Sequence, residues 1–105
     1  MKVVFHVDEL GMIREARHNI EYVLLTEPDA EIVLLMNGEA VQGYLLPRMS
    51  KFMKEYQDVT YQACHQSMRN FRVRSKQMHE QVEIIESGVI GLVKLQEQGY
   101  SYVKC

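Results

Sequence analysis

The feature that most constrains this chain is a regular alternation of short β-rich runs with longer segments of helical spacing. Five runs favour strands, namely residues 3–7, 31–36, 59–64, 82–85 and 100–103. Every connection between them exceeds the roughly 10–12 residues that a crossover between parallel strands requires. The pattern predicts one α/β domain over residues 1–105, with a mostly parallel five-stranded sheet covered by helices on both faces, flavodoxin-like in style.

The intervening segments predict which helix faces are buried. The first helix shows a stripe formed by Ile13, Ala16, Ile20, Val23 and Leu24. A short helix is expected over 39–46, and Pro47 should open another with an apolar face of Met49, Phe52, Met53 and Tyr56. Ser87 is a plausible N-cap of the last helix, Gly99 its stop, and Val89, Leu92, Val93 and Gln96 its shared face. The stretch 65–81 is poorly periodic and predicts short helical turns in a loop.

Composition excludes several classes of protein. The apolar fraction is 47%, the charged fraction 25% and the net charge −2, so no positive field draws the chain to nucleic acid or an anionic membrane. The longest apolar runs have about five residues, far below the roughly 20 of a membrane helix. His6, Asp8 and Glu9 interrupt any signal-peptide core. We therefore expect a cytoplasmic protein whose two cysteines start out reduced.

Polar residues come directly after the predicted strands, at the places where ligands bind in an open α/β sheet. They are Asp8, the turn Asn37-Gly38, Cys64 with Ser67 shortly after it, and Ser87-Gly88. Backbone amides at such turns bind anions, and glycine allows close approach, so these residues are candidate anion or ligand contacts. A tight turn that holds no ligand is the alternative at Asn37-Gly38.

Cys64 is the sharpest candidate for chemistry. It ends a strand and precedes a predicted helical turn, and a helix start with nearby cations lowers a thiol pKa. Arg69 and Arg72 belong to a basic segment that contains no acid, so we expect them to assist. His65 is a second possible assistant, although neighbouring side chains in a helical turn diverge. The alternative is a buried, inert cysteine.

Other sites find less support. The chain contains no Cys-x-x-Cys, no His-x-x-x-His and no Gly-x-Gly-x-x-Gly, so we expect neither a metal site nor a bound cofactor. His6 lies within a predicted strand and is interpreted as a structural histidine. Cys105 could resolve a disulfide, but it is more simply an exposed end.

Together these motifs resemble the small DsrE/DsrF-like proteins. The resemblance rests on Lys2-Val-Val-Phe-His-Val-Asp8, Asn37-Gly-Glu-Ala-Val41, Tyr61-Gln-Ala-Cys64 with Ser67-Met68, Ser87-Gly-Val-Ile-Gly-Leu-Val-Lys-Leu-Gln96 and Gly99-Tyr-Ser-Tyr-Val-Lys104. It covers nearly the whole chain. It implies a three-layer α/β/α sandwich that forms dimers, trimers or hexamers, and a sulfur-carrying role for Cys64.

Two functions agree with these features. The first is a persulfide carrier or sulfurtransferase-like protein of intracellular sulfur metabolism, with a sulfur donor or acceptor protein as partner. The second is a non-enzymatic oligomeric module that binds a small anion at the carboxyl edge of the sheet. The abundance of methionine and aromatic residues, notably the Met49 stripe and Tyr102, leads us to expect a homo-oligomer.

Overall fold

The computed structural model describes all 105 residues and confirms the α/β/α sandwich. Its strands are β1 (Lys2–Val7), β2 (Glu31–Met36), β3 (Thr60–Cys64), β4 (Val82–Ile85) and β5 (Ser101–Lys104). Its α-helices are α1 (Ile13–Thr26), α2 (Pro47–Glu55), α3 (His65–Asn70) and α4 (Gly88–Glu97). Short 3-10 helices occupy Leu10–Met12, Gly38–Leu45 and Ser75–Gln77. The segment predicted as a short helix is therefore a 3-10 helix, and β3 and β5 each begin one residue later than expected.

The five strands form one sheet in the order β4-β3-β2-β1-β5, and every neighbouring pair is parallel. The sheet is thus wholly parallel rather than mostly so. β1 lies between β2 and β5, as a short strand that is buried on both faces should. β4 and β5 are the two edges, and all four residues of β5 are exposed.

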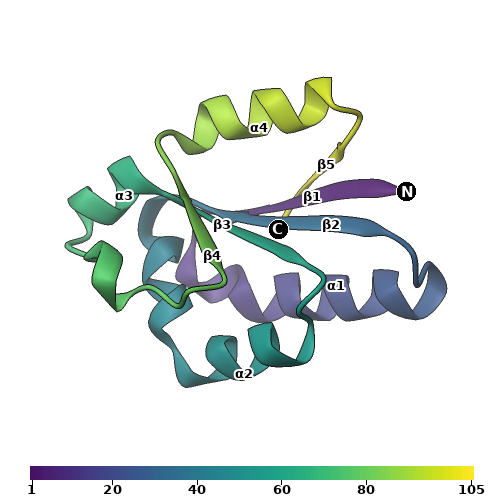
Figure 1. Ribbon diagram of the computed structural model, residues 1–105, viewed down its shortest axis with the longest axis horizontal. Coiled ribbons are helices and arrows are strands. Elements are labelled where there is room, and N and C mark those ends of the chain that lie inside the picture. The colour runs from purple at the N-terminus through teal and green to yellow at the C-terminus, as the bar shows by residue number, and fades with distance from the viewer.

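The two faces of the sheet are covered unequally. Figure 1 shows α1 and α2 beneath the sheet and α4 alone above it. The α1–α2 side holds a cluster of 21 buried residues, whereas the α4 side holds only five, namely Val4, Val33, Leu35, Leu92 and Leu95. Because α4 is the only helix on this face of the sheet, β3 and β4 are less covered there.

Two expectations about helix faces need correction. In α4 the buried side chains are Leu92 and Leu95, while Val89 and Val93 are exposed and Gln96 does not share the buried face. In α2 the stripe expected to leave apolar surface for a partner is buried within the chain, with Met49 and Met53 fully covered. Tyr56 lies half-buried against the same core. The α2 stripe therefore gives no support to an oligomer.

Candidate functional site

Cys64 lies where the direction of the chain crossovers changes. After β3 the chain turns into α3, whose Met68 joins the core on the α1–α2 side. After β4 the chain turns into α4 on the opposite face (Figure 1). In an open parallel sheet, the crevice between two such strand ends is the usual place for ligands. The last residue of β3 and the first residues of α4 meet there.

The Ser67 hydroxyl and the backbone amides of Gln66, Ser67 and Gly88 surround the sulfur of Cys64 as hydrogen-bond donors, and each acts to lower the pKa of the thiol. The residue is only 5% exposed, and burial is the largest single influence on its pKa, acting to raise it. The donors together outweigh burial, so the pKa of the Cys64 thiol is lowered from its ordinary value. The thiolate is the nucleophilic form of cysteine, and this site stabilises it.

Ser67 is aimed at the sulfur by the turn after β2. The amide of Gly38 donates to the Ser67 Oγ over 2.8 Å, which leaves the hydroxyl proton free to point at Cys64. Gly38 adopts a φ of +56°, a left-handed conformation that L side chains rarely adopt. The Asn37-Gly38 turn thus acts on Cys64 through Ser67.

Gly88 allows α4 to begin against the site. A Cβ at this position would lie 3.1 Å from the Cβ of Asn37 and 3.4 Å from the Cβ of Cys64. Its absence lets the Gly88 amide reach the sulfur. The preceding Ser87 is the N-cap of α4, as predicted, and its Oγ accepts from the Ile90 amide over 3.3 Å. Ser87 is therefore directed to its own helix rather than to the thiol.

His6, interpreted from the sequence as a structural histidine, links Asn37 to Tyr102 beside the site, a connection that the sequence did not predict. His6 is buried, with Nε2 2.7 Å from the Asn37 Oδ1 and Nδ1 2.6 Å from the Tyr102 hydroxyl. Since the amide oxygen only accepts, Nε2 donates, and in the neutral imidazole the tyrosine hydroxyl then donates to Nδ1. This orientation turns the Asn37 Nδ2 toward Gly88, where a Cβ would lie 3.3 Å from it. The available signal was the polar position of His6 on the same strand face as Val4.

Asp8 lies apart from the thiol, although it comes after β1 at the same edge of the sheet. Its carboxylate accepts from the Lys104 ammonium over 2.8 Å. This hydrogen bond lowers the pKa of Asp8 and raises the pKa of Lys104. Asp8 thus fastens β5 to the end of β1, and the structure does not bring its side chain to Cys64.

The basic segment does not act on Cys64 as expected. Arg69 lies 3.0 Å from the Nδ1 of His65 and 3.6 Å from the carboxylate of Glu86, and His65 itself is 3.7 Å from that carboxylate. Arg72 is exposed in a turn with a φ of +57°. The lowered pKa of Cys64 comes from Ser67 and the backbone amides instead of these cations. His65 faces Glu86 and Arg69, in line with the expected divergence from the thiol.

Cys105 is half-buried and not the exposed end that the sequence predicts. Its amide donates to the His6 carbonyl over 2.9 Å, and its side chain packs half-buried against the larger core cluster. Burial raises the pKa of this thiol, although the Asn19 amide lies 3.6 Å from the sulfur and acts in the other direction.

No group of three or more His, Cys, Asp or Glu side chains is placed to hold a metal ion. No helix is both long and apolar enough to cross a membrane.

Solved structures share this fold. The protein of unknown function MTH1491 from Methanobacterium thermoautotrophicum superposes with a TM-score of 0.89 at 22% identity, over 99% of this chain and 98% of that chain. The ychN protein from E. coli gives a TM-score of 0.77 at 12% identity over the full length of both chains. Neither a protein-family model nor a curated protein matches the sequence. At these identities the structural neighbours establish the α/β sandwich and leave the chemistry to the site itself.

Proposed function

We propose that this protein is a persulfide carrier or sulfurtransferase-like protein that works in intracellular sulfur metabolism in the cytoplasm, with Cys64 as the sulfur-carrying thiol. The observation that carries the proposal is the convergence of four hydrogen-bond donors on one buried sulfur. An inert structural cysteine needs no such donors, because a neutral thiol behaves as a small apolar group. The resemblance to DsrE/DsrF-like proteins, in some branches of which a cysteine at the end of a central strand carries sulfur, adds support.

The chemistry arises from the thiolate. The Cys64 sulfur attacks the sulfane sulfur of a donor such as thiosulfate, a new S–S bond forms, and the old S–S bond breaks to release sulfite. The products are a persulfide anion on Cys64 and sulfite, so charge balances without a proton. Passage of the outer sulfur to an acceptor thiolate restores Cys64. The same hydrogen-bond donors stabilise Cys64 when it leaves as a thiolate during transfer of the outer sulfur.

The hydrogen bonds favour the carrier over a module that binds a free anion. The amides that the sequence offers to a ligand are those of the turns at Gly38 and Gly88. In the structure the first donates to Ser67 and the second to Cys64. The anion that these turns stabilise is therefore the Cys64 thiolate and not a free ligand.

Intact-protein mass spectrometry after exposure to thiosulfate or polysulfide tests the proposal. We expect one added sulfur atom, confined to Cys64 by peptide mapping and removed by a reducing thiol. Cys64→Ser should take up none, and Cys105→Ser should behave as the parent protein. Sulfur on Cys105 alone, or none on either thiol while a small molecule co-purifies, would overturn the carrier.

We further propose that the chain works as a homo-oligomer, as a dimer, trimer or hexamer. Support comes from the unpaired edge at β5 and from a neighbouring depression of about 440 Å³ lined by Met1, Phe5, Tyr22 and Val103. Tyr22, whose side chain is 62% exposed, adds apolar surface to this depression. Sedimentation tests the proposal, and a species at the chain mass of 12.3 kDa would contradict it.

A further inference from the structure

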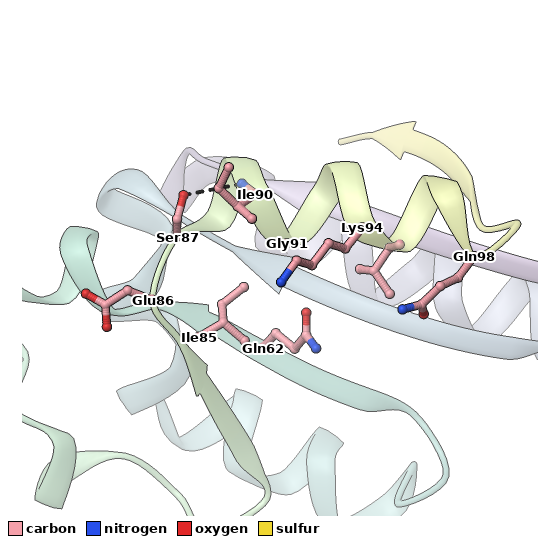
Figure 2. Close-up of a pocket in the computed structure, with 9 residues that line it drawn as sticks. Gln62, Ile85, Glu86, Ser87, Ile90, Gly91, Lys94 and Gln98 are labelled. Atoms are coloured by element: carbon pink, nitrogen blue, oxygen red, sulfur yellow. Dashed lines mark hydrogen bonds between the residues drawn. The ribbon is translucent and has the colours of Figure 1, made fainter.

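A groove of about 490 Å³ runs along α4 on the thinly covered face of the sheet. Its lining includes Gln62, Ile85, Ile90, Lys94, Leu95 and Gln98. Figure 2 shows Ser87 at one end, Gln98 at the other, and Gln62 with Ile85 between them as the floor. This volume falls within the range of about 300–1,000 Å³ that small-molecule sites occupy.

Cys64 does not line the groove but lies directly beside its floor. Side chains alternate along a strand, so Gln62 and Cys64 share one face of β3. On β4, Ile85 pairs with Cys64 and Glu83 pairs with Gln62 in the parallel register. Ile85 therefore lies both in the floor of the groove and beside Cys64. A molecule in the groove that reaches past Ile85 arrives at the sulfur from the side of α4.

Lys94 is the only cation that lines the groove, and its ammonium takes part in no ion pair within the chain. In Figure 2 its side chain extends back along α4, with the ammonium above the floor between Ile85 and Gln62. The one acidic lining residue, Glu86, points away from the floor in this view and is held by Arg69 and His65. The open part of the groove thus presents one positive charge over a floor made of the apolar Ile85 and the amide of Gln62.

We propose that this groove binds the body of the small sulfur compound that reacts with Cys64, and that Lys94 pairs with a carboxylate or sulfonate on that compound. The inference rests on the proposed role of Cys64 and adds the class of its reaction partner. The occupant is an anionic organic sulfur compound with a short apolar segment. The charge of Lys94 selects for the anion, Ile85 and Ile90 select for the apolar segment, and the 5% exposure of Cys64 selects for a small compound.

Paired methanethiosulfonate reagents of opposite charge test the proposal without any persulfide. The Cys64 thiolate attacks the sulfenyl sulfur, a disulfide forms, and methanesulfinate leaves, so the reaction needs no oxidant. The readout is the labelling rate with the sulfonatoethyl reagent divided by the rate with the trimethylammonioethyl reagent. Both rates are measured at one pH in a Cys105→Ser background, so the thiolate fraction cancels.

Divided by the same ratio for a small free thiol, the ratio should exceed one in the parent protein and fall by up to about fivefold in Lys94→Gln, the upper size expected of one exposed charge pair. Ile90→Glu, which places a carboxylate in the groove, should lower the ratio further. The matched control is Lys51→Gln on the exposed side of α2, which removes the same charge from the opposite face and should leave the ratio unchanged.

Equal falls in Lys94→Gln and Lys51→Gln would show an effect of net charge alone and overturn the groove site. An unchanged ratio in Lys94→Gln would also overturn it. So would labelling that slows as protein concentration rises, because a second copy would then fill the groove. Since the reagents need only a thiol, loss of charge selectivity with intact persulfide formation would reject the groove and keep the carrier. Retained charge selectivity without any persulfide formation would reject the carrier and keep the groove.

Discussion

The two thiols of this chain both lie at the carboxyl ends of parallel strands, yet the fold shifts their pKa values in opposite directions. Cys64 ends β3 and its pKa is lowered, whereas Cys105 comes directly after β5 and its pKa is raised. Burial acts to raise the pKa of both and is the largest influence on each. The difference lies in the donors, because Cys64 receives one hydroxyl and three backbone amides and Cys105 receives one distant side-chain amide.

This comparison shows that the pKa of a thiol at a strand end depends on the segments that pack around it beyond the strand. After β3 the chain enters α3 and packs under the start of α4, so free amides point at the sulfur. Near Cys105 the neighbours are the first helix and the larger apolar cluster, which supply little beyond burial. Measurements on the two thiols in one protein therefore test the contrast directly.

The largest expected effect is a separation of the two thiols in alkylation by a small neutral reagent such as iodoacetamide. The rate at Cys64 should rise with a pH midpoint below that of an ordinary cysteine, and the rate at Cys105 with a midpoint above it. Midpoints are compared instead of absolute rates, because Cys64 is the more covered residue. Peptide mapping of labelled protein across pH measures both in one sample, and coincident midpoints would refute the contrast.

Ser67→Ala should move the Cys64 midpoint upward and leave the Cys105 midpoint in place. The variant removes the hydroxyl that donates to the sulfur and leaves the Gly38 amide without its acceptor, which should cost about 1 kcal/mol of unfolding free energy. Ser75→Ala, at an exposed serine in a 3-10 helix, is the matched control. If both variants left the Cys64 midpoint unchanged, the backbone amides alone would account for the activation.

The thiols should also shape stability against pH in opposite directions. The folded pKa of Cys64 lies below its unfolded value, so its contribution is present above the unfolded pKa and is lost as pH falls through the folded pKa. The folded pKa of Cys105 is raised, so its contribution is present below the unfolded pKa and is lost as pH rises through the folded pKa.

Urea unfolding from about pH 6 to about pH 10 measures this effect. The stability of the parent minus that of Cys64→Ser should grow with pH, and the corresponding difference for Cys105→Ser should shrink. Parallel curves for the two differences would mean that the thiols share one environment, contrary to the structure.

The smallest effect is expected from Arg69→Gln. A thiol activated by nearby cations would lose much of its reactivity in this variant. The structure instead directs Arg69 to Glu86 and His65 in an exposed cluster, so the Cys64 midpoint should barely move. Stability should change by no more than about 0.5 kcal/mol. A large upward shift of the Cys64 midpoint would restore the basic segment as the activating group.

Periodicity was enough to predict the architecture. The run 31–36 is a strand with the predicted bounds, Pro47 opens α2, Ser87 caps α4 and Gly99 adopts a φ of +97° beyond its end. These features depend on local spacing and on backbone preferences that each residue carries with it. The α4 face was wrong for a related reason, because Gly88 and Gly91 allow the helix to approach the sheet on a side that side-chain hydropathy does not indicate.

The sequence by itself determined that Cys64 ends a strand before a helix at the ligand-binding edge of a parallel sheet. The predicted helical turn after Cys64 also supplies the amides of Gln66 and Ser67, whereas only the tertiary structure decided where the Ser67 hydroxyl points and that the Gly88 amide joins them. Ser67 is turned by Gly38, the Gly88 amide comes from another crossover, and His6 holds Asn37 beside them. The physical reason is that hydrogen bonding is directional and short in range. Donors distant in sequence act on one sulfur only after the sheet has set the strand ends side by side.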